Sequence, residues 1–296
     1  MISHFHLPGL FEFYEFYKKF LPLYRFHKEY FYDWCDIASI YGAPEDCLWG
    51  GGRTSFGIAE AKDVFELMNE FEISPRLTFS NSLIRSEHLD DKKCNRLCKL
   101  FENSKVATGI IIHSDLLLNY LKNQFANFYF ISSTTKVLTN FLDFESELNR
   151  EDFSFVVPDF RLNKSFEKFN SLSQKQKDKV EFLCNECCDF TCIERKTCYE
   201  NESRKNLGEK VISHKCTAHN SENGYRFSLA MKNPGFISVN EIEKKYLPLG
   251  FSNFKIEGRG LGSAILLEFI LYYMIKPEYH LKVREEIYLD SMLDLF

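Results

Sequence analysis

The chain has 296 residues, 45% of them hydrophobic, which is enough to bury the core of one large domain or two medium ones. Its net charge of -5 lacks the basic surplus that broad, non-specific nucleic-acid binding needs, although a local basic channel stays compatible with it. The first residues lack the pattern of a secretory signal, and the longest apolar run, 264–275, is shorter than the ~20 residues of a membrane span. We therefore expect a cytoplasmic globular protein without a membrane span, whose ten cysteines stay reduced.

Apolar segments alternate with helical segments along the chain. The aromatic residues 1–31 predict an N-terminal helical cap that is interrupted at Pro22. Seven strand-like runs follow, at 36–41, 76–81, 109–114, 128–133, 153–157, 180–183 and 253–256. Helical patterns separate the runs, and residues 262–296 predict C-terminal helices. Such βα units recurring every ~25 residues indicate a parallel sheet.

Seven strands and one gap in the count favour a TIM-like (β/α)8 barrel over an open doubly wound sheet, with an incomplete or distorted barrel as the variant that the gap leaves open. We expect this barrel to form a single α/β domain over 1–296. The polar stretch 200–226 has little periodicity and predicts a loop inserted into this barrel. A glycine-rich loop at 50–52 stands between a strand and a helix, where backbone amides and Arg53 can bind an anion. The alternative is a plain tight turn, because the loop matches no nucleotide-binding pattern.

Polar side chains follow the predicted strands, at the barrel end where enzymes of this architecture carry their active sites. The candidates for catalysis are His113, Glu186, Glu257 and Arg259. The candidates for substrate binding are Arg53, Asn81, Ser133 and Arg161. Helix capping is the alternative role for Ser133, and a hydrogen-bonded scaffold role is the alternative for His113.

Residues 180–199 carry five of the ten cysteines, at Cys184, Cys187, Cys188, Cys192 and Cys198, and Cys216 follows within the polar stretch. Thiols crowded after a strand predict a metal or iron–sulfur site, with buried reduced thiols or disulfides as the alternatives. His214 and His219 flank Cys216, so that a mixed cysteine and histidine zinc site stays open.

The segment 250–259, GFSNFKIEGR, resembles the G-[ILV]-x-x-[FL]-K-I-E-G-R segment of peptidase family U-32, and the cysteine run is similar in outline to a form found in that family. The resemblance implies a TIM-barrel-like fold. In several relatives four cysteines hold an iron–sulfur cluster for oxygen-independent hydroxylation of a ubiquinone precursor or of an RNA base. Asn185 and Glu186 stand where the peptidase signature has a small pair of residues.

Carried over to this chain, the resemblance implies a [4Fe-4S] cluster on Cys188, Cys192, Cys198 and Cys216, with Cys184 and Cys187 in reserve. The expected activity is hydroxylation, or a related redox modification, of an aromatic small molecule or of a nucleobase in RNA. Two alternatives stay open. One is a peptidase or other hydrolase that uses zinc or a thiol, and the other is a non-catalytic subunit with a structural metal, paired with a second protein of the same family.

Overall fold

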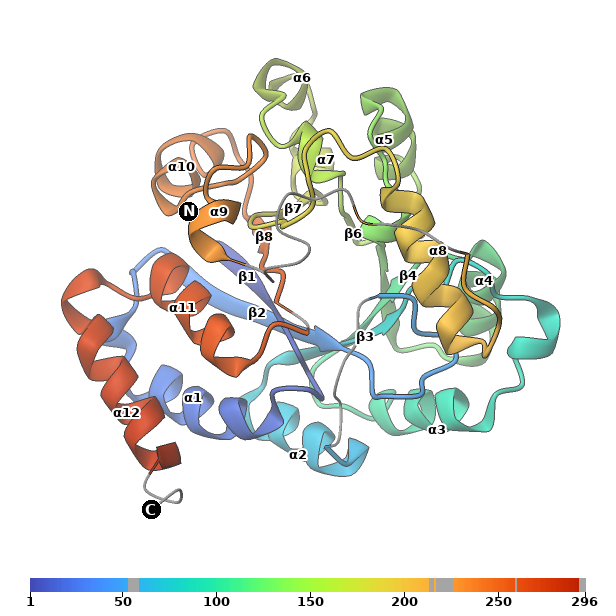
Figure 1. The fold of residues 1–296 in the computed structure, drawn as a ribbon, viewed down its shortest axis with the longest axis horizontal. Helices are drawn as coiled ribbons and strands as arrows, with labels where there is room; N and C mark the ends of the chain where they lie inside the picture. The colour runs from blue at the N-terminus through green and yellow to red at the C-terminus, as the bar shows by residue number, and fades with distance from the viewer. Residues whose placement is uncertain (53–58, 213–215, 217–225, 259, 293–296) are drawn as a thin grey trace.

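The protein is a barrel of eight parallel strands surrounded by helices (Figure 1), seen in a computed structural model that describes residues 1–52, 59–212, 216, 226–258 and 260–292. The strands are β1 (Ser3–Pro8), β2 (Cys35–Gly42), β3 (Ser74–Phe79), β4 (Thr108–Ile112), β5 (Phe128–Ser132), β6 (Phe155–Val156), β7 (Glu181–Leu183) and β8 (Asn253–Lys255). Their order in the sheet is β6-β5-β4-β3-β2-β1-β8-β7. A single parallel bridge between Val156 and Val180 joins β6 to the start of β7 and nearly closes the barrel. The predicted (β/α)8 architecture is confirmed.

Helices follow most of the strands and cover the outside of the barrel. The α-helices are α1 (Tyr14–Phe26), α2 (Ala61–Phe71), α3 (Lys92–Phe101), α4 (Asp115–Gln124), α5 (Phe141–Leu148), α6 (Phe166–Asn170), α7 (Gln174–Lys177), α8 (Arg195–Asn206), α9 (Phe227–Ala230), α10 (Val239–Glu241), α11 (Ser263–Met274) and α12 (His280–Met292). Shorter helical turns are η1 (Lys28–Tyr30), η2 (Ser86–His88), η3 (Thr134–Lys136), η4 (Phe160–Leu162), η5 (Ile242–Tyr246) and η6 (Pro277–Tyr279). None of the described helices combines the length and apolar composition that crossing a bilayer requires.

Two apolar cores hold the barrel together. The larger core lies between the sheet and the helices, and its members include the buried aromatic rings of α1 and α11. A smaller cluster comprises Tyr41, Ile111, Ile131, Val157 and Leu183, which come from or directly follow five different strands. Side chains on parallel strands alternate between the two faces, which is why one sheet contributes to both cores.

The first strand of the barrel lies inside the segment predicted as a helical cap. β1 (Ser3–Pro8) pairs with β2 on one side and with β8 on the other, so it fills the gap in the predicted strand count. The cap prediction is therefore wrong for these residues. Its sequence SHFHLP interrupts the apolar run with two histidines, and His6 is fully buried, so the strand lacks an ordinary apolar pattern. The break predicted at Pro22 is also absent, because α1 runs through it and buries Leu21 and Leu23 on either side of the proline.

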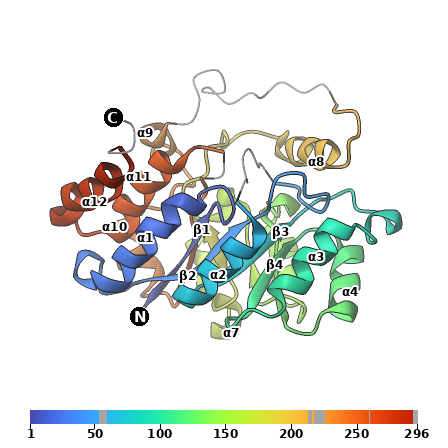
Figure 2. The same ribbon diagram turned by 90° about the horizontal axis from the view of Figure 1, so that it is seen from below.

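The polar stretch predicted as a loop begins as a helix. α8 extends to Asn206 and therefore covers the first part of 200–226, whereas residues 213–215 and 217–225 lie outside the described part of the chain. Figure 2 shows α8 beside the barrel on the side opposite α7. Hydrophobic periodicity could not predict α8, because the helix's own residues are mostly polar and show no apolar face. Polar contacts hold it at the carboxyl ends of the strands, where the amide of Asn81 donates to the carbonyl of Ser203 (3.2 Å).

Candidate functional site

A small cavity of about 40 Å³, lined by both polar and apolar residues, lies at the carboxyl ends of the strands, where barrel enzymes bind their substrates. Five of its lining residues carry an aliphatic hydroxyl group: Thr78, Ser80, Ser133, Thr134 and Thr135. Thr78 and Ser80 are buried, and their hydroxyl groups make no hydrogen bond to any described residue. Because a buried hydroxyl without a partner is unfavourable, these two groups are suited to bind a polar atom of a ligand.

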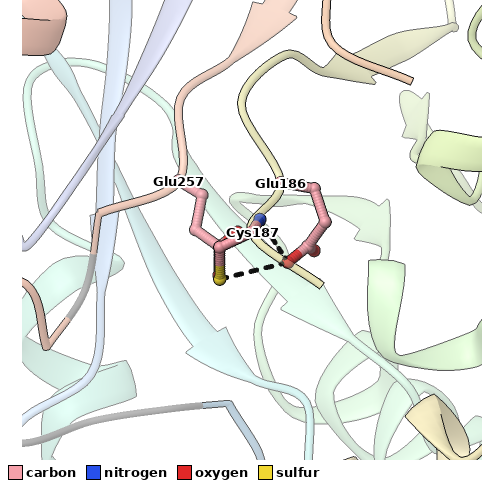
Figure 3. A group of neighbouring side chains, drawn as sticks. All are labelled: Glu186, Cys187 and Glu257. Atoms are coloured by element: carbon pink, nitrogen blue, oxygen red, sulfur yellow. Dashed lines mark hydrogen bonds between the residues drawn. The ribbon is translucent and has the colours of Figure 1, made fainter. Parts of the chain in front are cut away.

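Three side chains that can bind a metal meet at this cavity (Figure 3). Within the described part of the chain, one such group has its ligand atoms within 4.8 Å of one another, namely Glu186, Cys187 and Glu257. The first two follow β7 and the third follows β8. A carboxylate oxygen of Glu186 accepts the backbone amides of Cys187 (2.9 Å) and Cys188 (3.0 Å), which fixes the turn that carries both thiols.

Arg195 connects the cysteine segment to the barrel. Its guanidinium is 1% exposed and forms an ion pair with Glu186 and a hydrogen bond with the hydroxyl of Tyr199 (2.9 Å). It also lies 3.8 Å from the carboxylate of Asp159. Burial acts to lower the pKa of Arg195, but the negative charges around it, Glu186 foremost, raise that pKa well above its usual value. Arg195 is therefore positively charged at all physiological pH values, and this charge is buried beside the cysteine segment.

A second arginine holds the same segment from the neighbouring strand end. Arg161 forms a two-point ion pair with Asp159 (2.6 and 3.1 Å) and donates to the carbonyl of Cys192 (2.7 Å). The amide of Asn233 donates to the carbonyl of Cys188 (2.9 Å). Arg161 was predicted to bind substrate. It lies beside the cysteines, and its guanidinium donates its hydrogen bonds to Asp159 and Cys192 within the protein.

The predicted cluster cysteines occupy different surroundings. Cys188, Cys192 and Cys198 are half-buried, Cys216 is exposed, and all ten cysteines of the chain are thiols rather than disulfides. None of these four belongs to the group within 4.8 Å, but that spacing describes a single ion, whereas the irons of a cluster hold their thiolates further apart. The reserve residue Cys184 is fully buried in the outer core, where burial raises its pKa, so its thiol faces away from the cavity.

The other predicted site residues divide between the cavity and its supports. The ring of His113 shares a hydrogen bond with the hydroxyl of Thr135 (2.8 Å), and burial lowers its pKa to about 4. Ser133 lines the cavity and also caps η3, so that both predicted roles meet in one residue. Asn81 is buried, and its amide is bonded to Leu48 and Ser203 within the protein. Arg53, Arg259, His214 and His219 lie outside the described residues.

Buried charges beneath the cavity are the main feature that sequence reasoning missed. Glu181 binds Arg76 (2.5 Å) and Lys255 (3.2 Å), and all three side chains are at most 5% exposed. Lys255 also lines the cavity, so the cluster reaches the site from below. The ring of His6 lies 3.6 Å from the same carboxylate. A charged residue at or next to the start of an apolar strand run, as in RLTF and VEFL, was the sequence signal for this buried cluster.

Comparison with known proteins yields one structural match. No family model matches the chain, and no curated protein matches it. The fold is similar to the solved structure of the U32 peptidase Mk0906, with a TM-score of 0.48 and 13% sequence identity, over 86% of this chain and 92% of that one.

Proposed function

We propose that the chain is a U32-type barrel enzyme that modifies an aromatic small molecule or a nucleobase at the carboxyl ends of its strands, here called the mouth, with one polar group of the substrate entering the cavity of about 40 Å³ beside Thr78 and Ser80. The modification is an oxygen-independent hydroxylation or a related redox step, and it depends on a [4Fe-4S] cluster. One observation carries the proposal: the turn after β7 and the first turn of α8 hold the half-buried thiols of Cys188, Cys192 and Cys198, close in the chain to Glu186 and Tyr199, which line the cavity. Family membership rests on the KIEGR-type segment that ends at Arg259.

The donor set fits a thiolate-bound cluster. Cys188, Cys192 and Cys198 are free thiols, and Arg161 holds the backbone between them by donating to the carbonyl of Cys192 (2.7 Å). Cys216 supplies the fourth thiolate in this assignment. It follows α8, which is attached to the barrel by contacts independent of any metal, such as those between Asn81 and Ser203.

The residues around the cavity provide the remaining chemistry. A bound cluster of this type supplies single electrons. Thr78 and Ser80 donate hydrogen bonds that orient a polar group of the substrate. Burial lowers the pKa of His113 to about 4, so its ring is neutral at pH 7 and a weak base; it contributes by orienting the hydroxyl of Thr135 (2.8 Å) rather than by accepting a proton. Glu186 is held as a carboxylate by Arg195 and acts as an anion rather than as an acid.

Metal analysis after oxygen-free purification tests this proposal. The wild-type protein should be brown, absorb broadly near the visible range, and contain iron and acid-labile sulfide. Cys192→Ala should lose both, whereas Cys35→Ala, which changes a half-buried thiol at the amino end of β2, should keep them. Full iron content in Cys192→Ala would refute the ligand assignment, and a wild-type protein without iron would refute the cluster.

A second candidate function has its own observation. Glu186, Cys187 and Glu257 have the spacing of a mononuclear site, which suits zinc in a hydrolase. The ion pair between Glu186 and Arg195 opposes it, because the guanidinium competes with the metal for the carboxylate. Stoichiometric zinc that is lost in Cys187→Ala and retained in Cys192→Ala would favour this function over the first.

A further inference from the structure

A second group of cysteines lies away from the mouth, on the outside of the barrel. Cys47 belongs to the loop after β2, and Cys94 and Cys98 occupy successive turns of α3. The sulfur atoms of Cys47 and Cys94 are 3.5 Å apart, and the two residues are 2% and 0% exposed. The proposed cluster uses none of these thiols.

The contact between the two sulfurs is close to that needed for a covalent bond. A disulfide has an S–S distance of about 2.05 Å, so the atoms must approach by roughly 1.5 Å. The approach requires a movement of the loop that carries Cys47, in which Glu45 and Asp46 are exposed and the carbonyl of Glu45 accepts a hydrogen bond from Lys93 (2.7 Å). On the other side, the carboxylate of Asp91 caps α3 by accepting the amide of Cys94 (2.7 Å), which keeps that thiol in place.

An open cleft is lined by sequence neighbours of this pair but not by the cysteines themselves, so an oxidant reaches the sulfur atoms only when the loop after β2 opens. A hollow of about 470 Å³ is lined by residues adjacent to both cysteines, among them Asp46 beside Cys47 and Lys93 beside Cys94. Arg96 and Glu60 also line it, so the cleft presents charges of both signs. Low-molecular-weight peptide disulfides such as glutathione disulfide carry ammonium and carboxylate groups and suit such a lining.

We propose that Cys47 and Cys94 form a redox modification site that closes reversibly to an intramolecular disulfide, with a low-molecular-weight peptide disulfide as the oxidant. One thiolate attacks the oxidant, forming a mixed disulfide and releasing one small thiol. The second thiolate then attacks the bound sulfur and releases the other small thiol. The protein loses two protons and two electrons, and the oxidant is reduced to two thiols.

The disulfide affects the mouth of the barrel through the loop that carries Cys47, because this loop contacts α8. Two residues further on, the indole of Trp49 donates to the carbonyl of His88 (2.8 Å), and Gly50 accepts a hydrogen bond from Asn206 at the end of α8 (2.7 Å). A covalent link to α3 therefore fixes the loop against which α8 rests. Because the hydrogen bond with Cys47 and burial raise the pKa of Cys94, exchange is slow and responds to sustained oxidation.

Peptide mapping after equilibration of the full-length protein with glutathione buffers tests the proposal. Combined cleavage after Glu45 and at lysine and arginine places Cys47, Cys94 and Cys98 in separate peptides, since Arg96 stands between the last two. The expected product is a cross-linked pair of the Cys47 and Cys94 peptides, with two alkylatable thiols lost at these positions and regained with dithiothreitol. Disulfides among the mouth cysteines yield different peptides and do not interfere.

Matched variants separate this pair from its neighbour. Cys98→Ala should form the link as the wild type does, and Cys94→Ala should not form it. Recovery of Cys47 and Cys94 as thiols from folded wild-type protein at an oxidising glutathione ratio would overturn the proposal, as would a link from Cys47 to Cys98. The wild-type map decides the question even if a variant fails to fold.

Discussion

Removing the negative charge at the centre of the buried cluster should destabilise the barrel strongly. Glu181→Gln keeps the shape of the side chain but leaves the cations Arg76 and Lys255 without their counter-charge, and these two side chains are 1% and 5% exposed. Although burial acts to raise the pKa of Glu181, Arg76, His6 and Lys255 lower it well below its usual value, so the carboxylate is ionised at neutral pH. Breaking a buried pair by removing one partner costs about 3–5 kcal/mol. We expect a loss of this size in the free energy of unfolding, measured by urea denaturation at pH 7.

The control for this variant is an ion pair of similar geometry at the surface. Glu268 binds Arg284 through two hydrogen bonds (3.0 and 2.9 Å), but both side chains are more than a third exposed. Glu268→Gln should therefore cost about 0–1 kcal/mol. Adding Lys255→Met to Glu181→Gln removes one of the two stranded cations and should recover part of the loss. Equal effects of the two glutamine variants would refute the reasoning that burial, rather than geometry, sets the magnitude.

Two further variants test the barrel interior and the mouth. Burial and the charge of Arg76 lower the pKa of His6 to about 3, so the unfolded chain, in which histidine titrates near pH 6.5, binds the extra proton and stability falls as the pH drops from about 6.5 towards 3. Between pH 7 and pH 5, His6→Gln should lose about 2 kcal/mol less free energy of unfolding than the wild type, and parallel pH profiles would contradict this. Gly51→Ala would place a methyl group 2.3 Å from the carbonyl oxygen of Ser80 at the end of β3, and we expect a loss of about 1–3 kcal/mol; an unchanged melting temperature would show that the loop moves aside freely.

The repeating pattern made the architecture predictable, because seven of the strands are apolar runs followed by helices. The first strand was hidden by His4 and His6, since a strand with a charged cluster on its inner side lacks the apolar run that identifies its neighbours. α8 was hidden for the opposite reason, because polar contacts such as those of Ser203 hold it and leave no apolar periodicity. Local patterns reveal burial against a hydrophobic core but not burial through ion pairs.

The barrel architecture predicts candidate site residues one at a time, from their positions after the strands, but not the contacts between them. Glu186, Glu257 and Ser133 do line one cavity, as their positions after strands suggested. The role of Arg195 could not be read from the sequence, because its partners Glu186 and Asp159 come from two different strand ends. Long-range pairing of this kind depends on the closed barrel.

The unequal closure of the barrel has a consequence for folding. β1 to β6 pair in chain order, so this part of the sheet can form while the chain is being synthesised. The other edge of β1 pairs with β8 (Asn253–Lys255), so it stays unpaired until that part of the chain has been made. Pairing residues so far apart in sequence has a large entropic cost of loop closure. The bridge between Val156 and Val180 joins residues that are near in sequence, but one bridge cannot hold β6 and β7 together by itself. Completion of the barrel, and with it assembly of the mouth between β7 and β8, is therefore expected as a late step that depends on the C-terminal part of the chain.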